Sequence, residues 1–311
     1  KVTIHDNCAY VSMGSGGARC VDISNPVQPV YRGSFDCPGS IFNIMVQDQY
    51  AYLAAYKDGL RVVDISSPFD PSETGFWDNA EYTSVFDVKL KGNYAFVCMS
   101  GGGMAVIDIS DKSNPVEKGY LDTPGFSYSL DVNEYLACIA DRDSLIIVDI
   151  TNPLNPERIS GVATDGSPRD VILRGDYAYV ADYYNGLVIL DISNPYNPVK
   201  VGHKDTQRAV NLELDGNYAY VADYGDGLTI IDISDPENPE IAGFYDTAAQ
   251  GEGVAVDGEY VYLADGEDGL YVVRFDPAGS NVDSEQSVQR CLKLYANYPN
   301  PFNPTTTIPY S

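Results

Sequence analysis

Short apolar runs, rich in β-branched residues, recur along this chain at a nearly fixed spacing. Seven of them share one pattern, in which an acidic residue follows the apolar stretch: ARCVDIS, LRVVDIS, MAVIDIS, LIIVDIT, LVILDIS, LTIIDIS and YVVRFDP. The acidic residue is Asp22, Asp64, Asp108, Asp149, Asp191 and Asp232 in the first six runs, and Arg274 takes its place in the seventh. Successive positions lie 42, 44, 41, 42, 41 and 42 residues apart. This regularity predicts seven copies of one structural unit.

Each unit is predicted to contain four strands. The first strand is short and alternating, as at residues 171–173, and a glycine turn such as 215–217 joins it to a Tyr-Ala-Tyr-Val strand. The apolar strand with the acidic residue comes third, and a proline-rich turn leads to a weaker fourth strand, as at 198–202. No segment keeps a 3.6-residue periodicity, so we expect almost no helix.

Four short antiparallel strands per unit are typical of a propeller blade. The sequence therefore predicts an all-β fold, a seven-bladed β-propeller of four-stranded antiparallel blades spanning residues 1–276. A two-sheet sandwich would not repeat its sequence in this way, and a β-solenoid would have shorter units. The seventh unit lacks an obvious fourth strand, so either residues near 291–295 supply it or that blade has three strands.

Two of the repeated strings carry a family resemblance. LRVVDIS at 60–66 and LIIVDI at 145–150 resemble the LVIVD repeat of bacterial and archaeal secreted or surface proteins. The resemblance covers about residues 1–276 and implies a propeller. It implies no activity, because most members of that family are uncharacterised.

The composition changes after residue 276. Residues 277–290 are rich in Ser, Asp, Glu, Gln and Gly, which predicts a linker, and a Pro/Asn-rich tail follows at 291–311. Within it, NYPNPFNPTTTIPY resembles the start of the C-terminal sorting domain of type IX secretion substrates, here truncated. That resemblance implies a secreted protein, or one on the outer-membrane surface of a Gram-negative bacterium, with the type IX machinery as a partner. A disordered proline-rich end is the alternative.

Charge and cysteine usage narrow the classes of partner. The chain has 19 Lys and Arg against 45 Asp and Glu, a net charge of −26, which argues against nucleic-acid binding. No run of 18 apolar residues exists, so no transmembrane segment is expected. The six cysteines lie at non-equivalent repeat positions without a CxxC pair, as small apolar fillers would, although Cys8 and Cys20 on adjacent strands could also pair.

Catalytic motifs are missing from the sequence, so function is sought where the blades differ from one another. GxSxG, HExxH and P-loop patterns do not occur. The candidate ligand-binding residues depart from the repeat or begin the inner strands: Trp77, Tyr82, Asp87, Tyr128, Arg169, Asp170, His203, Arg208, Asn211 and Glu252.

The aromatic and basic candidates each have two interpretations. Trp77, Tyr82 and Tyr128 are predicted to form a platform for a sugar or peptide, with packing between blades as the alternative for Trp77. Arg169 and Arg208 are rare positive charges in an acidic chain. They either contact a ligand or neutralise neighbouring aspartates.

Aspartate also recurs directly after the Tyr-Ala-Tyr-Val strand. Capping of tight turns is the structural interpretation of these residues. The functional one is a cation such as Ca²⁺, for which Asp182, Asp223 and Asp265 are the candidate ligands, and no other cofactor is expected. Their loops do not match the twelve-residue calcium loop. The aspartate of each DIS run is predicted to accept hydrogen bonds from the turn that follows.

These observations favour a secreted or cell-surface binding or scaffold propeller that contacts proteins or glycans through its channel face, without catalysis. The alternative is an extracellular polysaccharide hydrolase or lyase that uses carboxylates at the channel mouth. An enzyme should show a deep pocket with a few non-repeating polar residues and a perturbed carboxylate. A scaffold should show a shallow face on which the repeats stay equivalent.

Overall fold

The computed structural model of the protein describes residues 1–37, 39–67, 70–78, 84–247, 250–266 and 269–276, together with the backbone of 292–298. Every element in these residues is a strand, and the strands form seven four-stranded antiparallel sheets. The prediction of an all-β, seven-bladed propeller is therefore confirmed. The described residues include no helix that could span a bilayer.

Each blade is one continuous stretch of chain, with its strands hydrogen-bonded in sequence order. The strands of the first four blades are β1 (Val2–His5), β2 (Cys8–Ser12), β3 (Ala18–Asp22), β4 (Val30–Phe35), β5 (Asn43–Gln47), β6 (Tyr50–Ala54), β7 (Leu60–Asp64), β8 (Ser72–Trp77), β9 (Val85–Lys91), β10 (Tyr94–Met99), β11 (Gly103–Asp108), β12 (Val116–Leu121), β13 (Ser127–Val132), β14 (Leu136–Asp141), β15 (Ser144–Asp149) and β16 (Glu157–Ala163).

The last three blades follow the same plan. Their strands are β17 (Pro168–Arg174), β18 (Tyr177–Asp182), β19 (Gly186–Asp191), β20 (Val199–Lys204), β21 (Ala209–Asp215), β22 (Tyr218–Asp223), β23 (Gly227–Asp232), β24 (Glu240–Tyr245), β25 (Gly251–Asp257), β26 (Tyr260–Asp265), β27 (Leu270–Phe275) and β28 (Leu292–Tyr298).

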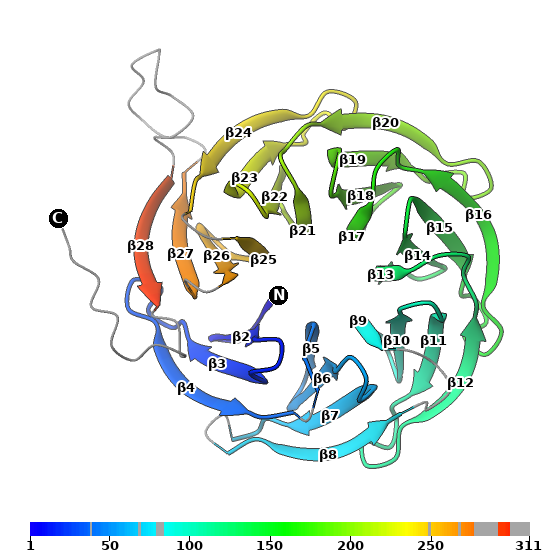
Figure 1. Ribbon diagram of the computed structural model, residues 1–311, viewed down its shortest axis with the longest axis horizontal. Coiled ribbons are helices and arrows are strands. Elements are labelled where there is room, and N and C mark those ends of the chain that lie inside the picture. The colour runs from blue at the N-terminus through cyan, green and yellow to red at the C-terminus, as the bar shows by residue number, and fades with distance from the viewer. Residues whose placement is uncertain are drawn as a thin grey trace.

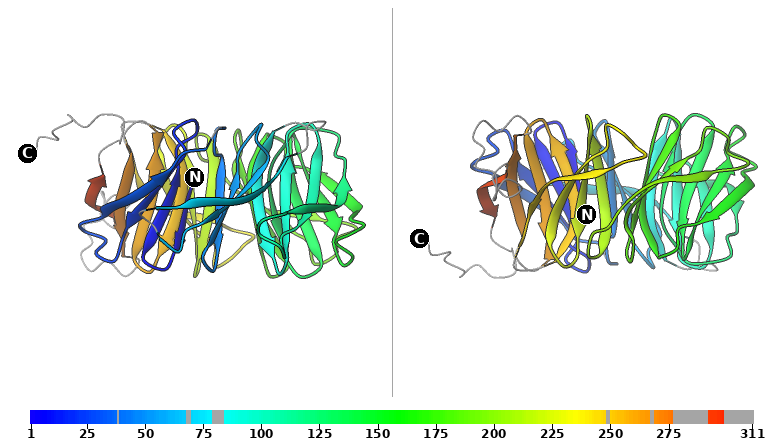
Figure 2. Two further views of the ribbon diagram at one scale, coloured as in Figure 1. Left: turned by 90° about the horizontal axis from the view of Figure 1, so that it is seen from below. Right: turned by 90° about the horizontal axis from the view of Figure 1, so that it is seen from above.

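The seven sheets are arranged around a central axis, with the first strand of each innermost and the fourth at the rim (Figure 1). Seen from the side, the molecule is a flat disc, and its strands run through the thickness of the disc (Figure 2). Loops that join second to third strands, and each blade to the next, emerge on one face. The tight turns between first and second strands emerge on the other.

Apolar residues are buried between adjacent blades rather than inside one sheet. The third strand of each blade is covered on both faces, which explains why LVIVD-type strings are apolar nearly throughout. Seven hydrophobic clusters each combine residues from neighbouring blades. One of them joins the seventh blade to the first and contains Val2, Val11, Tyr262 and Val272. The ring is therefore closed by apolar packing.

The outer strand of the seventh blade comes from the C-terminal part of the chain. β28 pairs antiparallel with β27, from Phe275↔Leu292 to Leu270↔Tyr298. Of the two arrangements that the sequence left open, this is the one with a fourth strand. The predicted linker at 277–290 and the NPFNPTTTIPY segment lie outside the described residues.

The recurrent DIS aspartates behave as the sequence predicted. In each case the carboxylate Oδ1 accepts the backbone N–H of the residue two positions on, at 2.8–3.0 Å, and so closes the turn that leads to the outer strand. The six pairs are Asp22–Ser24, Asp64–Ser66, Asp108–Ser110, Asp149–Thr151, Asp191–Ser193 and Asp232–Ser234.

The cysteines of the described residues are free thiols at strand or loop positions. Cys98 and Cys138 are buried, as apolar fillers would be. Cys8 and Cys20 lie on adjacent strands but not opposite one another, since Cys8 faces Asp22 and Cys20 faces Tyr10 in the ladder. Both are unpaired in this structure.

Candidate binding site at the channel mouth

A β-bulge begins the inner strand of five successive blades and places one extra residue at the channel mouth. In β13 the register steps from Ser127↔Asp141 to Ser129↔Ala140, which leaves Tyr128 unpaired. β9, β17, β21 and β25 shift at the same place. Bulges of this kind redirect a side chain out of the ladder. The extra residues, with Phe42 just before β5, are Phe42, Phe86, Tyr128, Arg169, Val210 and Glu252.

Phe42 and the bulge residues of the third and fourth blades form an arc of aromatic rings. Phe42 and Phe86 lie 4.7 Å apart by ring centroids, and Tyr56, from the loop after β6, contacts both of them at 5.4 and 5.5 Å. Tyr128 meets Phe86 edge to face at 6.2 Å. Edge-to-face and tilted contacts of this kind are the favoured geometries of aromatic pairs. Phe42 stays 39 % exposed, so the arc presents an apolar surface to solvent.

Arg169 continues the arc into the fifth blade. Its guanidinium lies 4.0 Å from the ring centroid of Tyr128 and 5.2 Å from that of Tyr183, which follows β18. Arg208 lies 5.9 Å from the same Tyr183 ring. Tyr183 in turn meets Tyr224 of the next blade at 6.5 Å. Two cationic groups therefore converge on one tyrosine at this side of the mouth.

A cavity of about 430 Å³ opens on the face with the long loops, and its lining includes Phe42, Phe86, Tyr128, Arg169, Tyr183 and Tyr224. That volume lies within the range of ordinary ligand pockets. Tyr56 and Arg208 lie beside these residues without lining the cavity. The wall is mostly aromatic and aliphatic, and Glu252 supplies its one carboxylate among the described residues. Lys1 also lines the cavity. In the first blade it holds the position that Asn43 holds in the second.

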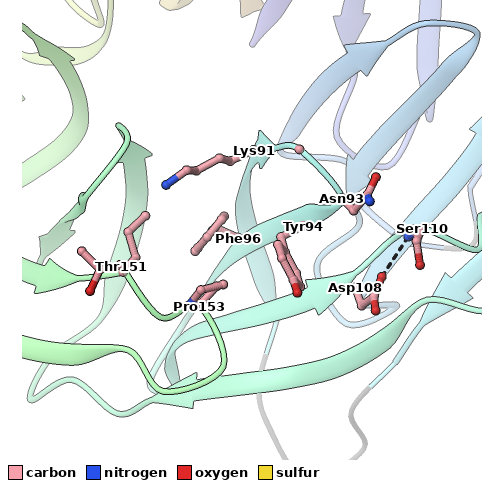
Figure 3. Close-up of a pocket in the computed structure, with 10 residues that line it drawn as sticks. Lys91, Asn93, Tyr94, Phe96, Asp108, Ser110, Thr151 and Pro153 are labelled. Atoms are coloured by element: carbon pink, nitrogen blue, oxygen red, sulfur yellow. Dashed lines mark hydrogen bonds between the residues drawn. The ribbon is translucent and has the colours of Figure 1, made fainter.

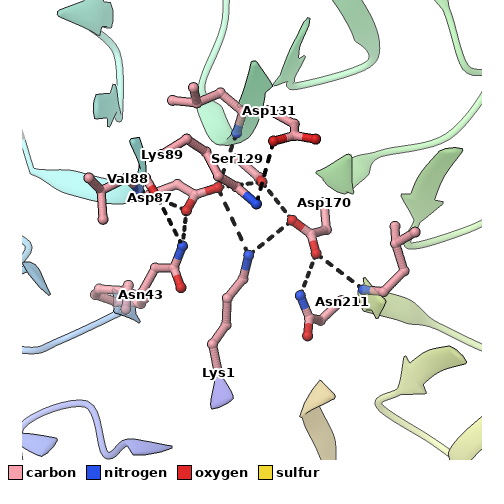
Figure 4. A network of polar contacts seen from close by, with 12 residues as sticks. Lys1, Asn43, Asp87, Val88, Lys89, Ser129, Asp131, Asp170 and Asn211 are labelled. Carbon is pink, nitrogen blue, oxygen red and sulfur yellow. Dashed lines mark hydrogen bonds and ion pairs between the residues drawn. The ribbon is translucent and has the colours of Figure 1, made fainter. Parts of the chain in front are cut away.

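Below the mouth, polar side chains from several blades meet across the channel (Figure 4). They stand at one equivalent position near the start of each inner strand, and the set is Asn43, Asp87, Ser129, Asp170 and Asn211. The Ser129 hydroxyl contacts both buried carboxylates, those of Asp87 and Asp170. Asn43 donates to Asp87, and Asn211 donates to Asp170. The carboxylates thus hold neighbouring blades together across the axis.

Two lysines offset the buried negative charge of this network. Lys1 Nζ lies 2.9 Å from Asp170 and 3.9 Å from Asp87, and Lys89 Nζ lies 3.7 Å from Asp131. Burial opposes the charge of Lys89, but Asp131 and Asp87 outweigh it and raise its pKa. Burial likewise opposes the charge of Asp170, but Lys1 and Lys89 hold the pKa of that carboxyl below its usual value.

The aspartates proposed as cation ligands cap loops in the structure. Asp182 Oδ1 accepts the backbone N–H groups of Ser167, Tyr184 and Asn185 at 2.8–3.2 Å. Asp223 accepts those of Arg208 and Gly225, at 2.9 and 3.2 Å, and Asp265 accepts the Thr247 hydroxyl at 2.8 Å. Each carboxylate so ties the loop entering its own inner strand to the loop after its second strand. Within the described ranges, no three His, Cys, Asp or Glu side chains are grouped to hold a metal ion.

The predicted ligand-binding residues separate into two groups. Asp87, Tyr128, Arg169, Asp170, Asn211 and Glu252 lie at the mouth or in the ring below it, and Arg208 lies beside them through Tyr183. Trp77 and His203 instead belong to outer strands. Trp77 is 8 % exposed and packs with Leu60 and Val85, as in the packing interpretation, while His203 Nε2 contacts Asn185 O at 2.8 Å. Tyr82 lies outside the described residues.

Several residues of the mouth were not identified from the sequence. Phe42, Phe86, Tyr56, Tyr183 and Tyr224 all line it or contact residues that do. The signal that could have found the first two is positional: each directly precedes the small polar residue that begins an inner strand. Aligned blade by blade, this position holds an aromatic residue in three successive blades and then Arg, Val and Glu in the next three.

A second cavity, of about 440 Å³, opens on the opposite face between the third and fourth blades (Figure 3). It is lined by residues that belong to the repeat itself, among them Tyr94, Asp108, Ser110 and Ile150. Asp108 accepts the Ser110 backbone N–H there, at 3.0 Å, as its counterparts do in other blades. The DIS turn at this cavity is therefore the same as in the other blades.

Comparison with known proteins agrees with the repeat. The LVIVD repeat family matches residues 1–37, 38–79, 84–123, 124–164, 165–206, 208–247 and 250–274. No curated protein is significantly similar in sequence. Many solved structures share the fold. One is the crystal structure of the computationally designed protein Ika8, at 11 % identity and a TM-score of 0.67, over 87 % of this chain and 81 % of that one.

Proposed function

The chain belongs to the LVIVD repeat family, and from this premise we propose that it is a binding propeller whose channel mouth holds a segment of a partner protein. One observation carries the proposal. The bulge at the start of the inner strands is the same backbone feature in five successive blades, yet it presents Phe, Tyr, Arg, Val and Glu in turn. A purely structural position would keep one residue type.

The composition of the mouth favours a protein ligand. Aromatic residues and arginine are the residues enriched in protein interfaces and their hot spots. Phe42, Phe86 and Tyr128 provide an apolar arc, and Arg169 and Glu252 provide opposite charges within one cavity. The rings meet one another tilted or edge on, which suits side chains inserted among them better than the flat face of a sugar.

The hydrolase or lyase alternative has less support at this site. A two-carboxylate mechanism needs a pair of acidic groups at the mouth. Among the described residues lining the cavity, Glu252 is the one carboxylate. Asp87 and Asp170 lie below it and are engaged with Ser129, Lys1 and the neighbouring asparagines.

We also propose an extracellular location, on the sequence alone. The support is the NYPNPFNPTTTIPY string, with its resemblance to type IX sorting domains, and the strongly acidic composition. Antibody labelling of intact and permeabilised cells of the source organism tests it. Labelling that appears only after permeabilisation would contradict an extracellular location. It would not affect the proposed binding role of the propeller.

A displayed library of random linear peptides tests binding at the mouth. Peptides selected on the wild-type propeller should bind Phe42→Ser about tenfold more weakly, because the variant removes an exposed apolar contact. The matched control is Tyr196→Ser, a 74 % exposed tyrosine on the turn between β19 and β20, on the opposite face. Failure to select any peptide, or equal binding to the Phe42 variant, would contradict the proposal.

A further inference from the structure

The guanidinium groups of Arg169 and Arg208 both lie near the ring of Tyr183, at 5.2 and 5.9 Å from its centroid. Neither guanidinium forms an ion pair within the part of the chain that the structure describes, although the protein carries 45 acidic residues. Ion pairs do form on the third and outer strands, where Arg61 pairs with Asp58 and Glu73, Arg274 pairs with Glu259, and Arg32 pairs with Asp22. Two positive charges beside one ring repel each other, and an anion bound next to them would offset that repulsion.

The geometry of Arg169 leaves its donors open. A guanidinium is planar and donates five N–H bonds in its own plane, and that of Arg169 lies 4.0 and 5.2 Å from the ring centroids of Tyr128 and Tyr183. Its Nε is buried and has no acceptor in the structure. A buried donor without an acceptor is costly, and an entering acceptor would relieve that cost.

We propose that Arg169 and Arg208 form an anion subsite, which binds a carboxylate of the partner segment while a neighbouring apolar side chain packs on Phe42, Phe86 and Tyr128. This inference rests on the proposed function, because it names the chemistry of the ligand at that same mouth. The carboxylate is that of an acidic side chain or of a chain end. Arg169 supplies the oriented donors, and Arg208, which is exposed, adds positive charge beside them.

The rest of the mouth limits how much negative charge the ligand carries. Glu252 lines the same cavity, two blades along from Arg169 and separated from it by Val210. Its carboxylate disfavours a second anionic group on that side. The surrounding acidic surface acts in the same direction over longer distances at low salt. We therefore expect a segment with one carboxylate beside an apolar residue, rather than a run of acidic residues.

Two small probes that differ only in charge test the subsite: N-acetyl-L-phenylalanine, with a free carboxylate, and N-acetyl-L-phenylalaninamide. Each is titrated into the ¹⁵N-labelled propeller, and the Arg169 Nε–H resonance is followed by NMR. The acid should shift that resonance and bind about tenfold or more tightly than the amide, since a charge-assisted hydrogen bond is lost in the amide. Raising the salt concentration should weaken binding of the acid and leave the amide unchanged.

Variants assign the effect to the two arginines. Arg169→Gln and Arg208→Gln should each remove the preference for the acid. Arg208→Gln should disturb folding less than Arg169→Gln does, because Arg208 is exposed. Arg174→Gln is the matched control: Arg174 ends the same strand as Arg169, also stacks on a tyrosine, at 5.3 Å from Tyr179, and faces the other side of the disc. It should leave both probes unaffected.

The outcomes separate this inference from the proposed function. Equal binding of acid and amide, no perturbation by either up to their solubility limits, or an unchanged preference in both mouth variants would overturn the anion subsite. The anion subsite would also be overturned if the selected peptides carry no acidic residue and bind Arg169→Gln as well as the wild type. If those peptides still bind Phe42→Ser more weakly, the mouth remains a peptide-binding site. Loss of peptide selection altogether would remove the function itself.

Discussion

At the scale of single residues, the buried carboxylates of the channel show how a polar group is made tolerable in a protein interior. Asp170 accepts from Lys1 Nζ at 2.9 Å, from Ser129 Oγ at 2.6 Å and from the backbone of Leu212 at 3.1 Å. The three partners belong to three blades, the first, fourth and sixth, and Asp170 itself belongs to the fifth. A charge satisfied in this way fixes the position of each inner strand relative to the axis.

Asp170→Ala should lower the free energy of unfolding by about 3 kcal/mol, because the buried Lys1 ammonium loses its nearest carboxylate and the Leu212 N–H loses its acceptor. Urea denaturation followed by circular dichroism measures the change. Asp205→Ala, at an 88 % exposed carboxylate, is the control and should stay within about 0.5 kcal/mol of the wild type. A cost for the Asp170 variant no larger than that of the control would show that the network contributes little to stability.

At the scale of elements, two local devices repeat from blade to blade: the DIS turn and the bulged inner strand. The turn was predictable, since an aspartate, a hydroxyl residue and a proline in sequence define it without tertiary information. The bulge was not, because nothing in the residues of 127–129 states that Tyr128 leaves the ladder. Register shifts depend on how the loop before the strand is anchored, here through Asp141 and its counterparts.

The same distinction explains which candidate residues were well placed. Arg169 stood out because positive charge is rare in this acidic chain, and Glu252 because it departs from the repeat; the structure puts both at the mouth. Trp77 stood out because it is the one tryptophan, yet it fills a gap between blades beneath the outer strand. Phe42 and Phe86 were missed because phenylalanine before a strand looks like ordinary core. Rarity marks a residue as different but does not say which face it occupies.

The DIS turns make the fold sensitive to acid. Hydrogen bonds from the following turn lower the pKa of Asp64, Asp108, Asp149 and Asp191, and with Arg32 they lower that of Asp22 to about 2. Unfolded aspartate titrates near 3.9. A carboxyl whose pKa is lower in the folded state contributes stability that is complete above about pH 4 and is lost as the pH falls through the folded value.

Asp22→Asn should therefore melt at a lower temperature than the wild type at pH 6, and the difference in Tm should shrink towards zero as the pH falls from 4 to 2. Differential scanning calorimetry over that range measures both proteins. Asp257→Asn, at an exposed strand end outside the DIS turns, is the control. A Tm difference for the Asp22 variant that stays constant down to pH 2 would contradict the argument.

At the scale of the whole molecule, the repeat explains the ring but does not by itself close it. Each blade has apolar faces that only a neighbour can cover, so seven copies in a line would leave two uncovered faces at the ends. Closure covers both. The sequence predicted the number of blades from the spacing of its third strands, whereas the contacts between first and seventh blades join residues far apart in the chain and needed coordinates.

The closing interface should contribute to stability as much as any other interface between blades. Val272, in the cluster that joins the seventh and first blades, and Val188, in the cluster between the fourth and fifth, are both fully buried. Replacing either by Ala removes two buried methyl groups and should cost about 2 kcal/mol. Urea unfolding of Val272→Ala and Val188→Ala, followed by fluorescence and by circular dichroism, compares them in one background.

The comparison also separates a closed ring from an open one. In a closed ring every blade has two neighbours, so both variants should lose similar stability and both probes should report one coincident transition. If the first and seventh blades part in solution, Val272 is exposed before the molecule unfolds. Val272→Ala would then cost less than about 0.5 kcal/mol while Val188→Ala kept its full cost, and a mouth assembled from successive blades around the axis would lose its fixed shape.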